Sequence, residues 1–314
     1  ENNAVSVQVT SSHLPLEFNG FKFMYPEGNG FTNPDLNEIK QFFRDENFEK
    51  GSSSVTKIDS RLENYKEHLK TYLSNFETDF DKKIIVDTLG GATHPLIVEI
   101  LEEIGAEVID LGENKEEKPY RNPPDPKPAK LEELKHAVNE ENAELGIATD
   151  MDGDRATVYK NGFISGDQLF GVFTQLVKSD IVASIDTSEM VEKTAKFNKN
   201  KVDYTRVGDP FVLDKAIEKN VELAGEPNGH YAFLVFVPYS SGTLSGVLAA
   251  GIDLDFYLSK LPDHFIEREN VEVSDKKQKM KAVKEHVKQH FDLISEIDGV
   301  KFRDGNSTVL VRSS

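Results

Sequence analysis

Short apolar runs alternate with amphipathic stretches along the middle of the chain. The runs at residues 83–87, 107–111 and 145–149 predict buried strands. Between them, apolar side chains recur with a helical period at residues 95–104 and 131–138. Because strand, helix and strand follow one another through short connections, this segment predicts βαβ units and a parallel sheet.

A second α/β segment follows after Asp167. Its expected helices lie at residues 169–177, 190–197 and 212–217, and its expected strands at residues 181–185, 201–205 and 222–224. At the N-terminal end, a strand at residues 5–9 precedes two helical stretches within residues 35–76.

The last fifty residues follow a different pattern. A long charged helix is expected over residues 276–290, followed by strands that Asp298-Gly299 and Asp304-Gly305 separate. Asp-Gly pairs are strong hairpin signals, so this part predicts a small α+β module. The chain starts and ends close to strands, and we therefore expect its first domain to be incomplete.

Composition narrows the classes of function. A formal net charge of −18 argues against nucleic acid or an anionic membrane as the main partner. No apolar run approaches the roughly 18 residues of a membrane span, and no signal peptide is visible. The absence of cysteine excludes disulfides and thiolate metal sites. An anionic ligand would therefore need a locally basic cleft, and the composition indicates no particular oligomeric state.

Three carboxylates stand at alternate positions directly after the buried strand at residues 145–149. They belong to Asp150, Asp152 and Asp154, and Arg155 follows them. Open α/β sheets bind ligands at the carboxyl ends of their strands, and carboxylate oxygens suit Mg²⁺. The segment therefore predicts a magnesium site used in phosphoryl transfer. An EF-hand is excluded, because Arg155 and Asn161 occupy the positions where such a loop needs Gly and Glu.

The same loop permits a second interpretation. Phosphatases of the haloacid dehalogenase type use an Asp-x-Asp-Gly-Thr motif whose first Asp is the nucleophile. Asp150, Asp152 and Gly153 fit this motif, but Asp154 stands where Thr is expected. A phosphatase that uses Asp150 as nucleophile therefore stays open as an alternative.

A second group of polar residues lies near the N-terminus. Residues 10–15 read Thr-Ser-Ser-His-Leu-Pro, and residues 18–22 read Phe-Asn-Gly-Phe-Lys. A serine where a strand passes into a loop, with His and Lys nearby, can serve as a nucleophile or phosphate carrier. Serine-rich turns are also common for structural reasons alone.

Together, the two groups resemble the α-D-phosphohexomutase superfamily of phosphomannomutases, phosphoglucomutases and phosphoglucosamine mutases. Its phosphoserine loop reads Thr-[Ala/Gly/Ser]-Ser-His-Asn-Pro, followed by Tyr-Asn-Gly-[Ile/Phe]-Lys. Residues 10–15 and 18–22 match except at Leu14 and Phe18. The superfamily's metal loop, Asp-x-Asp-x-Asp-Arg, is matched in full by residues 150–155.

Three further matches follow in the expected order. Residues 225–230 resemble the sugar-binding loop Gly-Glu-x-Ser-Gly-His, with Asn228 in place of Ser. Residues 206–209 resemble the third-domain loop that also faces the sugar. Residues 309–314 resemble the start of the Arg-x-Ser-Gly-Thr phosphate-binding loop.

The resemblance implies a role for each matched residue. Ser12 would carry the phosphoryl group, beside His13, with Lys22 as a proton shuttle and Arg155 facing the phosphoserine. Mg²⁺ would be held by phospho-Ser12 and the three aspartates. The implied substrate-binding residues are Arg206, Gly208, Asp209, Glu226, Asn228, His230, Arg312 and Ser314.

The fold implied is α/β, with successive mixed α/β domains around a central cleft and a small C-terminal α+β domain. The expected domains are residues 1–78 with the phosphoserine loop, 79–164 with the metal loop, 165–264 with the sugar loop, and 265–314 with the start of the phosphate loop.

The implied activity is that of a cytoplasmic, Mg²⁺-dependent phosphosugar mutase. It would interconvert hexose 1-phosphate and hexose 6-phosphate through phospho-Ser12 and a bisphosphorylated sugar, and an activator of the glucose 1,6-bisphosphate type would prime Ser12. A non-catalytic truncated relative is a third hypothesis. No residue distinguishes glucose, mannose and glucosamine phosphates.

Overall fold

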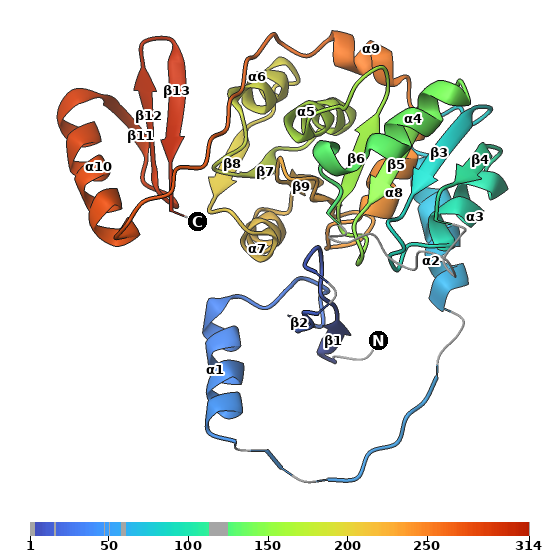
Figure 1. The fold of residues 1–314 in the computed structure, drawn as a ribbon, viewed down its shortest axis with the longest axis horizontal. Coiled ribbons are helices and arrows are strands. Elements are labelled where there is room, and N and C mark those ends of the chain that lie inside the picture. Colours follow the sequence, from blue (N-terminus) through green and yellow to red (C-terminus); the bar gives the residue numbers. More distant parts are fainter. Residues whose placement is uncertain are drawn as a thin grey trace.

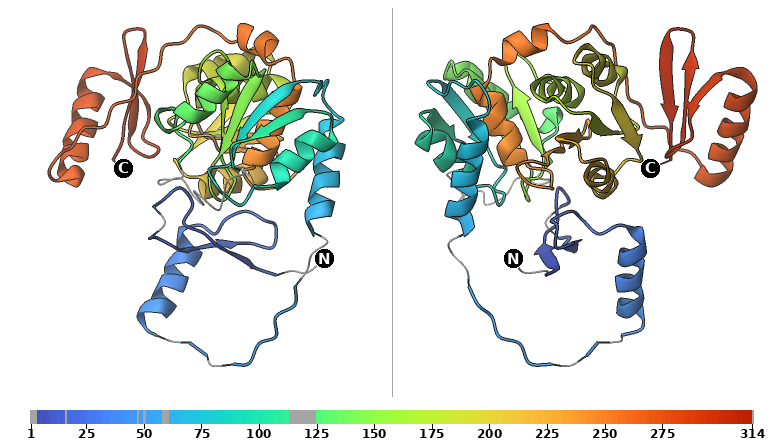
Figure 2. Two further views of the ribbon diagram at one scale, coloured as in Figure 1. Left: turned by 45° about the vertical axis from the view of Figure 1, so that its right-hand side comes forward. Right: turned by 180° about the vertical axis from the view of Figure 1, so that it is seen from behind.

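The computed structural model describes residues 4–15, 17–46, 48–49, 51–57, 61–112 and 125–313. Two mixed α/β units lie side by side, with the C-terminal module at one flank (Figure 1). The N-terminal hairpin lies against the edge where the two units meet, and Figure 2 shows the same arrangement from two further directions. The predicted succession of α/β modules and a small α+β module is confirmed.

The first unit is a four-stranded sheet in the order β4-β3-β5-β6. Its strands are β3 (Lys83–Asp87), β4 (Glu107–Asp110), β5 (Leu145–Thr149) and β6 (Ala156–Tyr159). One face packs against α4 (Glu132–Glu140) through Leu134 and Val138. The opposite face packs against α3 (Leu96–Glu103) and α8 (Gly242–Gly251), and α2 (Arg61–Leu73) joins the same apolar core.

The second unit repeats this plan in the order β10-β9-β7-β8. Its strands are β7 (Ile181–Ser184), β8 (Val202–Thr205), β9 (Leu223–Gly225) and β10 (Tyr231–Phe233). Helices α5 (Gly166–Leu176) and α6 (Glu189–Phe197) cover one face, and α7 (Asp209–Lys219) covers the other. One continuous apolar core runs from the first sheet into the second, so the two units are packed together rather than merely tethered.

Helix α8 ties the two units to each other. It follows the second unit in sequence but packs on β5 and β6 of the first. All ten of its residues are buried. The sequence pattern did not give the bounds of this helix, because a helix that is buried on every side has no polar face and so no amphipathic period.

Smaller elements complete the chain. The C-terminal module packs α10 (Lys276–His290) on the antiparallel strands β11 (Asp292–Ser295), β12 (Val300–Asp304) and β13 (Ser307–Val311). Strands β1 (Ser6–Val9) and β2 (Phe21–Met24) form a hairpin, followed by α1 (Asn33–Arg44). A short α9 (Leu254–Ser259) precedes the last module. Within the described residues, the helices are too short or too polar to cross a bilayer.

The predicted parallel pairing is confirmed, because β3 pairs in parallel with β4 and β5, and β7 with β8 and β9. β6 and β10 were not predicted, and each adds an antiparallel edge strand to an otherwise parallel sheet. They contain only four and three residues, which is too few for a two-residue alternation to stand out in the sequence. The expected domain boundaries stay predictions.

Candidate active site

The three aspartates lie together in the loop after β5. Asp150 and Asp154 are buried, Asp152 is half-buried, and one carboxylate oxygen from each lies within 4.8 Å of the others. Asp150 Oδ2 and Asp152 Oδ1 are buried and have no hydrogen-bond partner within the described residues. Unpartnered buried carboxylate oxygens that converge are what a hard divalent cation needs, so these residues fit Mg²⁺.

Close contacts at two glycines fix the conformation of the metal loop. Gly153 has φ +72° and packs so closely on Thr93 that an added Cβ would lie 2.2 Å from the threonine methyl. On the other side, Gly242 at the start of α8 donates its N–H to the carbonyl of Gly153 at 2.8 Å. A Cβ at Gly242 would lie 2.1 Å from the carbonyl oxygen of Arg155. Both positions therefore require glycine, and α8 directly supports the loop.

The aspartates differ in their electrostatic surroundings. Burial, followed by the charges of Asp154 and Asp152, raises the pKa of Asp150 well above its ordinary value. Burial alone would also raise the pKa of Asp154, but His230 and Lys22 outweigh it and hold that pKa far below the ordinary value. Asp154 is therefore the firmly ionised member of the group.

Lys22 supplies a positive charge from the N-terminal hairpin. Its Nζ lies 2.6 Å from Asp152 Oδ2 and 2.7 Å from Asp154 Oδ2. Burial by itself lowers the pKa of Lys22, but the carboxylates of Asp154 and Asp152 raise it well above the ordinary lysine value. Lys22 is thus a protonated counter-ion of the metal loop here. A lysine that acts as a base needs burial or neighbouring cations that lower its pKa, whereas Lys22 has two carboxylates beside it.

The loop that carries Ser12 approaches the metal loop through Thr10. Ser12 has φ +52°, a left-handed conformation that is uncommon outside glycine, and its N–H donates to Thr10 Oγ1 at 2.8 Å. Thr10 Oγ1 in turn donates to Asp152 Oδ2 at 3.2 Å. His13 Nδ1 lies 3.3 Å from Ser12 Oγ, and burial together with the charge of Arg155 lowers the pKa of His13.

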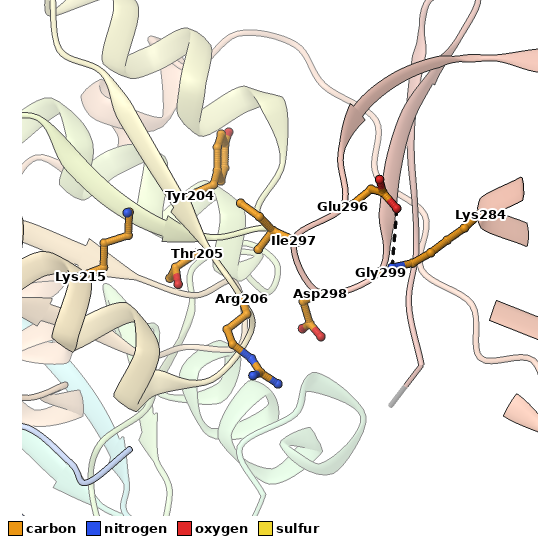
Figure 3. A pocket seen from close by; sticks show the side chains of 9 residues that line it. All are labelled: Tyr204, Thr205, Arg206, Lys215, Lys284, Glu296, Ile297, Asp298 and Gly299. Atoms are coloured by element: carbon orange, nitrogen blue, oxygen red, sulfur yellow. Dashed lines mark ion pairs between the residues drawn. The ribbon is translucent and has the colours of Figure 1, made fainter. Parts of the chain in front are cut away.

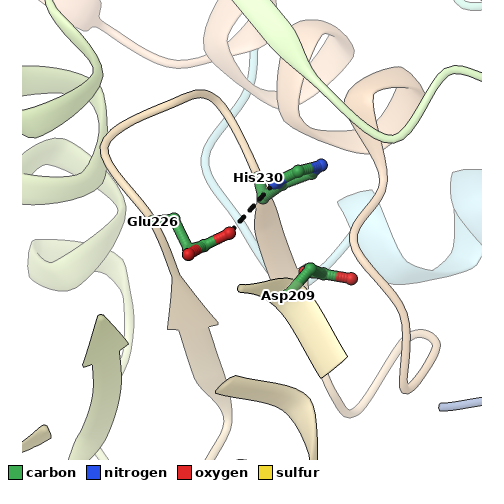
Figure 4. A group of neighbouring side chains, drawn as sticks. All are labelled: Asp209, Glu226 and His230. Carbon is green, nitrogen blue, oxygen red and sulfur yellow. Dashed lines mark hydrogen bonds and ion pairs between the residues drawn. The ribbon is translucent and has the colours of Figure 1, made fainter. Parts of the chain in front are cut away.

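His230 joins the metal loop to the predicted sugar loop. Its Nε2 lies 3.0 Å from Asp154 Oδ1, and its Nδ1 lies 3.2 Å from Glu226 Oε2 (Figure 4). Burial lowers the pKa of His230, but the two carboxylates outweigh it and raise that pKa well above the ordinary value. An imidazolium donates to both acids. Arg155 Nε, at 3.2 Å from the same Nε2, is then a close neighbour rather than a donor.

The loop between β8 and α7 contacts the predicted sugar loop through Glu226. Gly208 N donates to Glu226 Oε1 at 2.7 Å, and Asn228 Nδ2 donates to Glu226 Oε2 at 3.3 Å. The Asp209 side chain lies beside Glu226 and His230 and accepts a hydrogen bond from the Ser240 hydroxyl. Burial raises the pKa of Asp209 to about 6.

A cavity of about 500 Å³ lies between this second unit and the C-terminal module (Figure 3). Arg206, Lys215 and Lys284 line it together with Glu296 and Asp298. The Arg206 guanidinium lies 4.4 Å from the centre of the Phe211 ring.

The structure thus brings most of the expected residues together and separates a few. The metal loop, Lys22, Arg155, His230, Glu226, Gly208 and Asn228 are linked by direct contacts. Arg206 faces the cavity, Arg312 pairs with Asp298, and Ser314 lies outside the described residues.

Four contributing residues were not predicted: Thr10, Thr93, Ser240 and Asp298. Thr10 lies within the motif that pointed to Ser12, and Asp298 was noted only as a turn residue. Thr93 Oγ1 lies 2.7 Å from Thr149 Oγ1, which joins the segment after β3 to the base of the metal loop. Nothing in the local sequence marks Thr93 or Ser240.

Comparisons with known proteins agree with this geometry. The family model "Phosphoglucomutase/phosphomannomutase, alpha/beta/alpha domain II" matches residues 63–162, and the corresponding model of domain III matches residues 165–262. A probable phosphoglucosamine mutase of Methanococcoides burtonii is 30% identical, over 98% of this chain and 73% of its own length.

Two solved structures share the fold. A phosphoglucomutase/phosphomannomutase family protein of Burkholderia thailandensis superposes with a TM-score of 0.85 at 23% identity, over 99% of this chain and 69% of its own. Aspergillus fumigatus N-acetylphosphoglucosamine mutase, solved in complex with GlcNAc-6P and magnesium, gives 0.60 at 13% identity, over 96% and 83% of the two chains.

Proposed function

The chain belongs to the phosphoglucomutase/phosphomannomutase family and is a phosphosugar mutase. We propose that it moves a phosphoryl group between the 1- and 6-positions of a hexose through Ser12. The observation that carries this proposal is the contact between the two loops. Thr10 supports the backbone of Ser12 and also donates to Asp152 of the metal loop. This contact supports a shared reaction site for the serine and the converging carboxylates.

The metal would be Mg²⁺, held by Asp150, Asp152, Asp154 and an oxygen of phosphorylated Ser12. The unpartnered oxygens of Asp150 and Asp152 support this assignment, as does the magnesium in the fungal N-acetylphosphoglucosamine mutase. When bound, the ion neutralises charge on the phosphoryl group.

Three side chains would stabilise the phosphoryl group and transfer protons. Arg155 lies beside the aspartates and stabilises the phosphoryl oxygens. His13, whose pKa is lowered, accepts the proton of the attacking hydroxyl, while protonated Lys22 returns a proton to the leaving oxygen. Microscopic reversibility exchanges these roles in the reverse direction.

The sugar and its second phosphate would contact the other loops. Glu226, Asn228 and His230 bind sugar hydroxyls, with Gly208 and Asp209 beside them. The distal phosphate binds Arg312 and Ser314, with Arg206 at the edge of the cavity. Residues 1–78, 79–164, 165–264 and 265–314 would be the parts that carry the serine, metal, sugar and phosphate loops.

The test is a conversion followed by ³¹P NMR. The full-length protein is incubated with Mg²⁺, a trace of glucose 1,6-bisphosphate and the 1-phosphate of glucose, mannose or glucosamine. We expect the 6-phosphate to form without free phosphate. Ser12→Ala should be inactive and the matched control Ser11→Ala active. The fastest sugar identifies the substrate, with glucosamine the first choice because of the archaeal relative.

Other outcomes would favour the alternatives. Release of inorganic phosphate with unimpaired Ser12→Ala would make Asp150 the nucleophile of a haloacid dehalogenase-type phosphatase. No conversion, no phosphate on Ser12 and no bound metal would indicate a non-catalytic relative.

A further inference from the structure

Asp298 connects the C-terminal module to the loop that bears Gly208. Its Oδ2 accepts a hydrogen bond from Val207 N at 3.2 Å and another from Arg312 Nη1 at 3.4 Å. The next amide along the chain, Gly208 N, donates to Glu226 Oε1 at 2.7 Å. Consecutive amides of one loop therefore bind a carboxylate of the C-terminal module and a carboxylate of the sugar loop.

The turn that carries Asp298 is held tightly against Arg312. Asp298 and Gly299 have φ values of +48° and +121°. A Cβ at Gly299 would lie 2.3 Å from the carbonyl oxygen of Val311 and 2.8 Å from Arg312 Cβ. Since this fit leaves the turn no room to shift, the position of Asp298 relative to Arg312 is set by the backbone.

The other described contacts of this module lie elsewhere. Lys301 Nζ donates to the carbonyl of Ile185 at 3.0 Å, and Arg303 Nη2 pairs with Glu189 at 2.8 Å. These contacts attach the module to the loop after β7 and to the start of α6. The Asp298 contact with Val207 is the one among them that reaches the loop beside Glu226.

We propose that Asp298 is a positioning residue of the mutase reaction, which aims Arg312 into the cleft and holds residues 206–209 where Gly208 can orient Glu226. Asp298 acts through its neighbours and need not touch the sugar. The inference rests on the proposed roles of Arg312 and Glu226 in binding a phosphosugar.

The test compares two Asp-Gly turns of the same sheet. Asp298→Gly removes the carboxylate without backbone strain, because glycine readily adopts a φ of +48°. Asp304→Gly is the matched control, because exposed Asp304 precedes Gly305 in the second turn and forms no ion pair in the described part of the chain. We expect Asp298→Gly to raise KM for the phosphosugar about tenfold and to change kcat less than twofold, with Asp304→Gly like wild type.

A second readout does not depend on activity. Amide hydrogen exchange of the peptide that contains Val207 should become at least about fivefold faster in Asp298→Gly and stay unchanged in Asp304→Gly. Asp298→Asn should recover most of the protection, because its amide oxygen still accepts from Val207 N, but only part of the KM, because the charge facing Arg312 is lost. A purely structural turn would accept Gly and Asn equally.

The results separate the two proposals. Unchanged KM and unchanged exchange in Asp298→Gly would overturn the positioning role. A wild-type protein without mutase activity would contradict the proposed function, and the exchange of the Val207 peptide would still decide whether Asp298 holds the loop.

Discussion

The Nζ atom of Lys22 lies 2.6 Å from Oδ2 of Asp152, across 130 positions of sequence. The same Nζ lies 2.7 Å from Asp154 Oδ2. One ammonium group from the N-terminal hairpin thus offsets two of the three carboxylates in the metal loop. Lys22 and a divalent cation would be drawn to the same negative potential.

Lys22→Met should therefore raise the affinity of the protein for a divalent cation. The cation no longer competes with the ammonium group at Asp152 and Asp154. Removing one nearby unit charge is worth at least roughly 1 kcal/mol, so we expect about a fivefold gain or more. Calorimetric titration with Mg²⁺ or Mn²⁺ measures it. Lys160→Met is the control, because Lys160 pairs with Glu144 and Asp255 instead. Equal or weaker affinity in Lys22→Met would contradict the competition.

Asp150→Asn should stabilise the protein in the presence of a chelator. Asp150 is fully buried, and its Oδ2 lies 3.6 Å from Arg155 Nε and has no hydrogen-bond partner within the described residues. Neutralising Asp150 removes its repulsion with Asp154 and Asp152 and the cost of burying an unpartnered charge. We expect a gain of about 1–3 kcal/mol, the usual cost of an unsatisfied buried polar group. Thermal unfolding in EDTA should show a higher Tm, and the stabilisation by Mg²⁺ should be lost. Exposed Asp263→Asn should do neither, and a lower Tm of Asp150→Asn in EDTA would show the prediction to be wrong.

Asp209 should make folding stability depend on pH. Its pKa is raised from 3.8 to about 6, chiefly by burial, so the folded protein binds this proton more tightly than the unfolded chain. The resulting stabilisation is complete below pH 3.8 and is lost as the pH rises through about 6. Asp209→Asn should therefore raise the free energy of unfolding at pH 8 by about 3 kcal/mol, and by much less near pH 4. Calorimetric unfolding across this range tests it, and an equal effect at both pH values would refute it.

Gly242→Ala should destabilise the fold and weaken metal binding together. Alanine is normally the better helix former, but its Cβ here would lie 2.1 Å from the carbonyl oxygen of Arg155. The metal loop must move, at a cost of about 1–3 kcal/mol. Thermal unfolding and Mg²⁺ titration measure the two effects. Gly51→Ala is the control, because a Cβ there meets nothing within 4 Å. A stable Gly242→Ala with normal metal affinity would mean that α8 does not support the loop.

The sequence by itself determined the elements that have a clear pattern, and it pointed to the three aspartates as a candidate metal site. The predicted strands at residues 83–87 and 145–149 and the predicted helix at residues 276–290 agree with β3, β5 and α10. These elements have a clear period or a continuous apolar run, and such patterns arise from neighbours along the chain. Asp150, Asp152 and Asp154 could be recognised for the same reason, because they are close in sequence as well as in space.

Only the tertiary structure decided how the loops meet. His230 contacts Asp154 across 76 positions, and Asp298 contacts Val207 across 91. Such pairs depend on the packing of whole modules, which local propensity does not encode. The same holds for α8, whose residues are buried on every side because they fill the space between the two sheets. The sequence therefore indicated which groups are candidates for the chemistry, and the packing of the modules determined which of them lie in contact.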